Sequence, residues 1–305
     1  MASKGSKSTK AQNPQNPQNP YHPYNPQNNY KNQKMKTKFL AFVAVLVALC
    51  SVQGAKAWSG FGHGCIAYVA EQHLTPEAKE KCRYYLRHTL PYYASWMDRW
   101  RGSEHFKKVN SGHTVSVLSS GDGLNMKYGA MKHLVNTMNE LGNGKYKNLP
   151  DSVVRQRLIN MIHYVGDMHC PCHSKFSKKY FPQYKGKGTV YRGKKEVAYH
   201  GFWDGSPAMG RKGWEVEDYA KNVDKVSKKQ ATAWQSGTFA DWGRDIAKGG
   251  HQGFALYPEG KDINNLSPKE RKAIMALADE MAMQGAYRLA HVLNTIFADK
   301  SIKTR

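Results

Sequence analysis

The sequence His163-Tyr-Val-Gly-Asp167-Met-His169-Cys-Pro-Cys-His173 contains the densest group of potential metal ligands in the chain. The apolar pattern from Val153 to about His169 predicts a helix. His163 and Asp167 are four residues apart, so on that helix they lie one turn apart on the same face. His173 follows a proline, which bends or ends a helix. The stretch therefore predicts a helix whose end carries imidazole and carboxylate ligands.

A second pair with the same four-residue spacing is formed by His200 and Asp204. Imidazole and carboxylate groups are the expected ligands of zinc in a hydrolytic site. One such pair is a weak signal, because His and Asp on a helix often form only a surface hydrogen bond. Two pairs in one chain favour a metal site. Asp98, which stands among large aromatic residues, and His63 are further candidates.

The first 57 residues have the composition of a leader. Residues 1–34 are polar and rich in Asn, Gln and Pro, and such a segment buries too little apolar surface to offset its ordering entropy, so we expect it to be disordered. Residues 35–57 combine a basic start, a short apolar run and small residues at Ala55 and Ala57, the pattern of a signal peptide. We expect cleavage after Ala57 and a secreted or periplasmic protein. The alternative is an uncleaved anchor, although the apolar run is short for a membrane span.

Cleavage at this point makes Trp58 the first residue of the mature protein. A free α-amino group has a much lower pKa than a lysine side chain, so it can lose its proton to a metal. The amine and carbonyl oxygen of one residue can also chelate a metal together. Because His63 lies close by in Trp58-Ser-Gly-Phe-Gly-His63, we include Trp58 among the candidate ligands. The alternative is that Trp58 is simply the first ordered residue.

Residues 58–305 contain no linker, repeat or block of charge, which predicts a single domain. Thr75-Pro76-Glu77 and Ser267-Pro268-Lys269-Glu270 have the capping residues that begin helices. A further helix is predicted over 128–141, and a hairpin over 189–197. The predicted fold class is therefore mainly α with a small β-hairpin.

The chain carries 46 basic and 23 acidic residues. The leader holds eight of the basic residues and none of the acidic ones, so the mature chain has 38 against 23 and a net charge of +15. Such a surface attracts polyanions, of which nucleic acid comes first and anionic membranes second. Charge alone does not separate these partners from solubility in a salty exterior.

Four cysteines remain after cleavage: Cys65, Cys82, Cys170 and Cys172. An even number in an exported chain favours two disulfides, with three possible pairings. Zinc ligation by Cys170 and Cys172 is the alternative. We place it second because stronger candidate ligands surround these two residues.

Several motifs together resemble one family. Their order along the chain is Trp58-x4-His63, Trp96-x-Asp98, His163-x3-Asp167-x5-His173 and His200-x2-Trp203-Asp204. This is the order of the type I, single-strand-specific nucleases, the fungal S-one/P-one group. The segment Gly285-Ala-Tyr-Arg-Leu-Ala-His-Val-Leu-Asn294 is similar to the last helix of that family. The resemblance covers the whole mature chain and implies a helical fold shared with the related zinc-dependent phospholipases C.

The resemblance implies three zinc ions per chain. The ligands that it implies are Asp98, His113, His163 and Asp167 for the first ion, Trp58 (amine and carbonyl), His63 and a shared Asp167 for its close partner, and His173, His200 and Asp204 for the third. An aspartate at position 204, where a glutamate is the alternative, resembles the nucleases more than the phospholipases.

The surroundings of His113 depart from the family pattern. In the family, this histidine is followed by an aromatic residue that stacks on a base and by an aspartate that orients the attacking water. Thr114 and Ser116 stand at these positions here, and Asp122 is an alternative source of the acid. Arg101 matches a basic residue that stabilises charge on the phosphate. The alternative for Arg101 is a surface ion pair.

These observations predict an exported phosphoester hydrolase of the endonuclease or 3′-nucleotidase type, with metal-assisted chemistry in which Asp167 and Arg101 take part. The expected substrates are single-stranded DNA or RNA and nucleoside 3′-monophosphates, and no stable protein partner is implied. One alternative is a zinc-dependent phospholipase C, which would act at a membrane. The other is a zinc-binding surface protein without activity, which Thr114 and Ser116 would favour.

Overall fold

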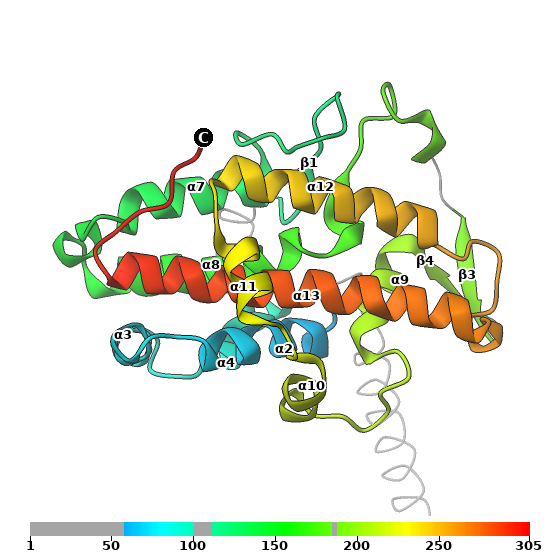
Figure 1. Ribbon diagram of the computed structural model, residues 1–305, viewed down its shortest axis with the longest axis horizontal. Helices are drawn as coiled ribbons and strands as arrows, with labels where there is room; N and C mark the ends of the chain where they lie inside the picture. Colours follow the sequence, from blue (N-terminus) through cyan, green and yellow to red (C-terminus); the bar gives the residue numbers. More distant parts are fainter. Residues whose placement is uncertain (1–57, 101–111, 185–187) are drawn as a thin grey trace, which may run out of the picture. The chain divides into compact units, whose positions relative to one another are not determined.

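Most of the chain that the computed structural model describes is helical (Figure 1). The structure describes residues 58–100, 112–184 and 188–305. The mainly α fold class with small β elements is therefore confirmed. The expectations for the leader and signal peptide (residues 1–57) and for Arg101 lie outside the described residues.

The described ranges contain α-helices, short strands and 3-10 helices. The α-helices are α2 (Gly60–Gln72), α3 (Pro76–Leu86), α4 (Leu90–Ala94), α5 (Trp96–Arg99), α7 (Gly129–Leu141), α8 (Asp151–Met168), α9 (Tyr199–Asp204), α10 (Val216–Val223), α11 (Lys228–Gln235), α12 (Phe239–Leu256) and α13 (Pro268–Phe297). The strands are β1 (Val115–Ser116), β2 (Ser174–Lys175), β3 (Thr189–Arg192) and β4 (Lys195–Ala198). Short 3-10 helices cover η1 (Lys145–Asn148), η2 (Pro171–His173), η3 (Pro182–Tyr184), η4 (Ser206–Ala208) and η5 (Ile263–Asn265).

Helix α8 lies at the centre of the packing. It contacts α2, α3, α4, α5, α7 and α13, and every residue from Leu158 to Met168 is buried. A helix that is surrounded by other helices has no solvent-facing stripe, so its polar residues are buried together with its apolar ones. His163 and Asp167 are completely buried for this reason. None of the helices in the described ranges is long and apolar enough to cross a membrane.

Two apolar clusters form the core and are joined by shared helices. One cluster contains Leu86, Leu134, Leu158 and other residues of α3, α4, α7 and α8. The second contains Trp203, Tyr219 and other residues of α9 and α10. Helices α2 and α13 contribute to both clusters and contact each other. The elements that carry the candidate ligands are thereby fixed to one core.

The local signals in the sequence predicted several elements correctly. The Thr75 side chain accepts a hydrogen bond from the Ala78 amide at the start of α3, and Ser267 and Glu270 form the capping box of α13. The predicted hairpin is the antiparallel pair β3–β4, in which Val190 lies opposite Val197. These elements depend on neighbouring residues, which is why the sequence alone predicted them.

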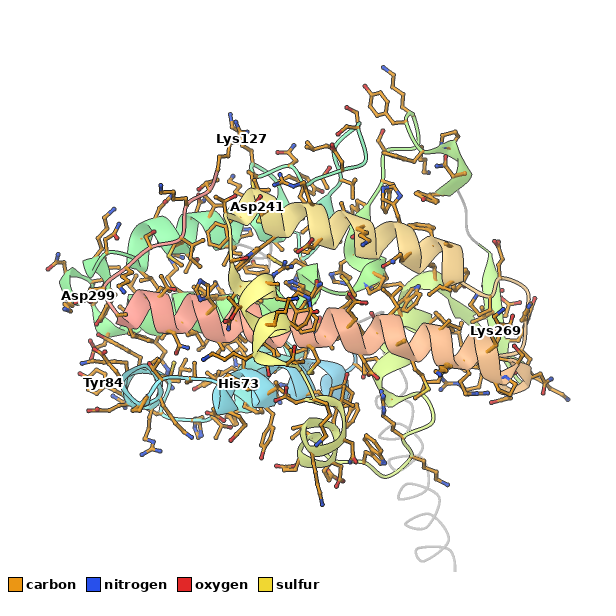
Figure 2. All side chains as sticks on the ribbon, viewed as in Figure 1. His73, Tyr84, Lys127, Asp241, Lys269 and Asp299 are labelled. Carbon is orange, nitrogen blue, oxygen red and sulfur yellow. The ribbon has the colours of Figure 1, made fainter. Side chains whose placement is uncertain are left out.

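Helix α12 is an element that the sequence reasoning did not predict. Thr238 and Asp241 form its capping box, and Figure 2 shows Asp241 near the start of this helix. Its glycines suggest a broken helix from propensity alone, because glycine costs about 1 kcal/mol per residue relative to alanine. In the structure the glycines face close neighbours. A Cβ atom on Gly250 would lie 2.5 Å from the Ser174 Cβ, and one on Gly253 would lie 2.5 Å from the Pro171 Cβ.

We expect Gly253→Ala to destabilise the protein. The added methyl group would meet Pro171 in η2, which α12 contacts directly, and overpacking of this kind costs about 1–3 kcal/mol. The measurement is the free energy of unfolding from urea titration. Gly60→Ala is the matched control, because the new Cβ in α2 would have the Ser95 Oγ as its nearest neighbour at 3.9 Å. Equal stability of Gly253→Ala and wild type would contradict the close packing of α12 on η2.

Candidate metal centre

The first pair of ligands comes from one face of α8. His163 Nε2 lies 3.1 Å from Asp167 Oδ2, as the four-residue spacing predicted. His163 Nδ1 donates a hydrogen bond to the Ala94 carbonyl oxygen over 2.8 Å, so Nε2 is the nitrogen that faces the carboxylate. A lone pair and a carboxylate oxygen at this distance repel each other unless a proton or a metal ion lies between them. The pair therefore has the geometry of a cation site.

His113 joins this pair although its sequence surroundings depart from the family pattern. Its Nδ1 lies 2.8 Å from Asp167 Oδ2 and 2.9 Å from His163 Nε2. Strand β1 begins two residues later, and its parallel pairing with β2 places Val115 opposite Ser174. This pairing holds His113 beside the end of α8. His113, His163 and Asp167 thus offer ligand atoms within 4.8 Å of one another.

His63 approaches the same carboxylate from α2. Its Nε2 lies 3.2 Å from Asp167 Oδ1 and 3.9 Å from Asp98 Oδ2. The His63 ring stacks on the His163 ring with centroids 4.4 Å apart and an angle of 16° between the planes. Asp98 lies in the short helix α5 and is buried. His63, Asp98 and His163 form a second group whose ligand atoms lie within 4.8 Å of one another.

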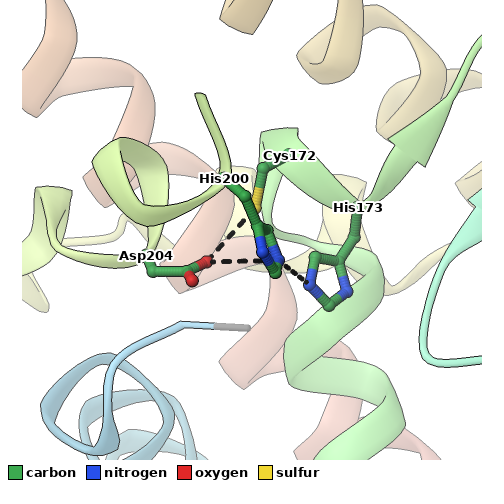
Figure 3. A group of neighbouring side chains, drawn as sticks. All are labelled: Cys172, His173, His200 and Asp204. Carbon is green, nitrogen blue, oxygen red and sulfur yellow. Dashed lines mark hydrogen bonds and ion pairs between the residues drawn. The ribbon is translucent and has the colours of Figure 1, made fainter. Parts of the chain in front are cut away.

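A third group lies beyond the end of α8 (Figure 3). His173 Nε2 is 2.9 Å from His200 Nε2, and His200 Nε2 is 3.8 Å from Asp204 Oδ1. His173 Nδ1 donates to the His113 carbonyl oxygen over 3.1 Å, which directs Nε2 toward the group. Cys172 also belongs to it, with Sγ 3.2 Å from Asp204 Oδ1. His173 Nδ1 is 3.7 Å from Asp167 Oδ1, so this group adjoins the others.

Trp58 is buried next to both parts of the site. Its indole Nε1 donates to the Gly166 carbonyl oxygen over 2.8 Å, one residue before Asp167. The Ser59 amide donates to the Asp204 carbonyl oxygen over 2.8 Å. The segment Trp58–Ser59 is therefore tied to α8 and to α9 beside a candidate ligand of each.

Burial and charge shift the pKa values of these groups in opposite directions. Burial alone would raise the pKa of Asp167, but the neighbouring imidazoles of His163 and His173 hold it well below its usual range. Burial lowers the pKa of His173 to about 3. Burial also raises the pKa of Asp204 to about 8, and the carboxylates of Asp167 and Asp98 add to this rise. Asp167 is thus held as an anion, and a cation beside Asp204 would favour its ionised form.

The residues fit a metal such as zinc. Their donors are imidazole nitrogens, carboxylate oxygens and one thiol, which are the usual zinc ligands. His63 Nε2, which faces Asp167 Oδ1, is buried and makes no hydrogen bond within the described residues. Buried polar atoms in native proteins nearly always have a partner. Backbone carbonyl oxygens accept hydrogen bonds from His163 and His173 and so fix the orientation of the rings, as is usual for histidines that bind metals.

The structure bears on two further sequence-based expectations. Asp122, the alternative source of the acid, accepts a hydrogen bond from Ser120 and lines a surface cavity of about 820 Å³ with Lys127 and Arg244, and its role as that acid stays a prediction. Within the described ranges Cys65, Cys82, Cys170 and Cys172 are free thiols, so the two expected disulfides are not shown there. Cys170 and Cys172 approach each other instead, with sulfur atoms 3.1 Å apart.

Two contributors to the site were missed or ranked too low by sequence reasoning. Cys172 was placed behind the histidines, although it stands directly before His173 in the sequence. Gly166 was not considered at all. A Cβ atom on Gly166 would lie 2.7 Å from His63 Nδ1, so α2 can bring its histidine to Asp167 only where α8 has a glycine. A glycine directly before a candidate ligand in an otherwise favourable helix was the available signal.

A mainly helical domain with buried, adjoining His/Asp groups that could hold metal ions has the donor groups of a metal-dependent hydrolase. Residues 58–298 match the family model described as S1/P1 nuclease, so the chain belongs to the S1/P1 nuclease family. This confirms the family expected from the spacing of the motifs, and it implies a nuclease that acts on phosphoester bonds. A comparison with curated proteins found no match.

We expect Gly166→Ala to displace His63 from Asp167, because the new methyl group would overlap the imidazole ring. Bound metal should fall by at least one ion per chain, and activity by about tenfold or more. Metal content is measured by elemental analysis of the purified mature protein. The matched control is Gly201→Ala, which adds a Cβ beside His200 at an ordinary 3.6 Å from the Val197 Cγ1. Unchanged metal content in Gly166→Ala would show that His63 is not a ligand.

Proposed function

We propose that the protein is an exported, zinc-dependent phosphodiesterase that hydrolyses single-stranded DNA or RNA and nucleoside 3′-monophosphates. The observation that carries this proposal is the convergence of three donor groups around and beside the buried Asp167 carboxylate. Membership of the S1/P1 nuclease family supports nucleic acid as the substrate class. The proposal also assigns zinc as the metal, a preference for single strands and export from the cell.

The proposed metal set is three zinc ions. Asp98, His113, His163 and Asp167 hold the first, Trp58 and His63 with Asp167 hold the second, and His173, His200 and Asp204 hold the third. Support for a shared Asp167 comes from its two oxygens, which face different partners: Oδ1 lies near His63, and Oδ2 lies near His113 and His163. A carboxylate with this arrangement is suited to bridge two ions.

The residues of the chain position the ions and the substrate for hydrolysis. When bound, zinc supplies an activated water near neutral pH and positive charge for the phosphate. Asp167 holds the group that contains His63 at a fixed separation from the group that contains His113 and His163. The Ala94 and His113 carbonyl oxygens fix the orientation of the His163 and His173 imidazoles. His200 has a side chain that is 32% exposed, so substrate reaches the site on its side. Arg101 contacts the phosphate in this proposal.

The substrate preference rests on charge. The mature chain has a net charge of +15, which raises the local concentration of polyanions. A zwitterionic phospholipid has no net charge and is attracted only weakly by such a field. A nucleic acid strand is attracted through the negative charge of each phosphate. The charge therefore favours the nuclease over the phospholipase C. An assay on denatured DNA and on phosphatidylcholine separates the two activities.

We expect the mature protein to hydrolyse denatured DNA, with little action on phosphatidylcholine, and to lose this activity in a metal chelator. Asp167→Asn should lower the rate by roughly 100-fold or more, because the carboxylate contacts both neighbouring groups. Hydrolysis of phosphatidylcholine alone would identify the phospholipase instead. No hydrolysis of either substrate by zinc-loaded protein would identify a zinc-binding protein without activity.

We also expect activity to require a free amine on Trp58. An amide nitrogen has no basic lone pair, so even one preceding residue removes a ligand. Protein that begins at Trp58 should carry one more zinc ion than protein with an N-terminal extension, which should be nearly inactive. Terminal sequencing, elemental analysis and hydrolysis of denatured DNA compare the two forms. Equal zinc content and equal rates would show that Trp58 is only a structural residue, held by its contact to Gly166.

A further inference from the structure

Cys172 belongs to the third donor group by position. Its Sγ lies 3.2 Å from Asp204 Oδ1 (Figure 3). The four residues Cys172, His173, His200 and Asp204 offer ligand atoms that all lie within 4.8 Å of one another. A single metal ion can therefore be reached by two imidazoles, one carboxylate and one thiol.

The backbone fixes the position of this thiol. Cys172 lies in the short 3-10 helix η2, between Pro171 and the ligand His173. The His173 amide donates to the Cys170 carbonyl oxygen over 2.9 Å. On the outer side, Pro171 packs against the glycine face of α12. The thiol is thus held next to the donor group before any metal binds, as an effective ligand must be.

Cys170 is the other thiol that could serve, and the geometry favours Cys172. Cys170 Sγ lies 3.8 Å from Asp204 Oδ1, compared with 3.2 Å for Cys172, and Cys170 is not part of the four-residue group. The two sulfur atoms are 3.1 Å apart. A disulfide between them would remove the thiolate from the metal, so the two roles exclude each other.

We propose that Cys172 is the fourth protein ligand of the third metal site, which then holds its ion through His173, His200, Asp204 and the Cys172 thiolate. This rests on the proposed metal site at the three other residues. Four protein ligands are typical of zinc sites that retain their ion, whereas three leave a position for water or substrate. The thiolate also cancels one more charge of a divalent ion. The third ion is therefore held firmly and is a weaker acceptor of phosphate charge than one bound by three ligands.

The test replaces the metal with cobalt in the mature protein. A cobalt–thiolate bond gives a charge-transfer band in the near ultraviolet, which imidazole and carboxylate ligands do not give. We expect the wild type and Cys170→Ser to show the band and Cys172→Ser to lack it. Cys172→Ser should also bind the third ion at least about tenfold more weakly in a metal titration. Circular dichroism of each variant checks that the fold is retained.

The outcomes separate this proposal from the function on which it rests. Absence of the band from cobalt-loaded wild type, or its persistence in Cys172→Ser, would overturn the role of Cys172 while leaving the metal site intact. A Cys170–Cys172 disulfide, found by mass spectrometry in metal-loaded protein, would overturn it as well. The double variant His200→Ala/Asp204→Ala, which removes two of the four donors, tests the site itself: if it binds as many cobalt ions as the wild type, there is no third site there and both proposals fail.

Discussion

The buried carboxylate of Asp167 is the constraint on which the candidate site depends. Removing a carboxylate from water costs several kcal/mol unless charges and hydrogen bonds offset the cost. Here the side chains of His63, His113, His163 and His173 surround it, at 2.8 to 3.7 Å from its oxygens. Burial lowers the pKa of His173 to about 3, so not all four imidazoles carry a positive charge at neutral pH. Metal ions supply the rest in our proposal, and metal binding is then coupled to folding of the central helix.

The sequence predicted the elements whose signals are local. Helix α3 begins after Thr75, and α13 begins after Ser267, because each cap needs only the next three residues. Helix α12 was not predicted because its glycines lower helix propensity. These glycines allow α12 to pack closely against Pro171 and Ser174, which lie more than 70 residues earlier in the chain. Propensity scales cannot represent such a contact, since it exists only after the two segments have packed together.

The same division applies to the site. The pairs His163–Asp167 and His200–Asp204 were predictable because helix geometry alone brings their side chains to one face. The position of His113 came only from the resemblance, and its partners are 50 and 54 residues away. The carbonyl groups that orient the imidazoles carry no signal in the sequence, because every residue has one. The structure also brings Cys172 into the third group, where the sequence had given it second place.

The strand pair β1–β2 explains how the site tolerates unusual residues after His113. The two strands pair Val115 with Ser174, just beyond His113 and His173. The His113 carbonyl oxygen accepts from His173 Nδ1, while its ring faces Asp167. These contacts use backbone atoms, two imidazoles and the Asp167 carboxylate, so they do not depend on the side chains of the residues that follow His113. The Thr114 carbonyl oxygen likewise accepts from the Ala130 amide. The positions after His113 can therefore lose an aromatic ring and an acid without displacing a ligand, which separates metal binding from recognition of the substrate.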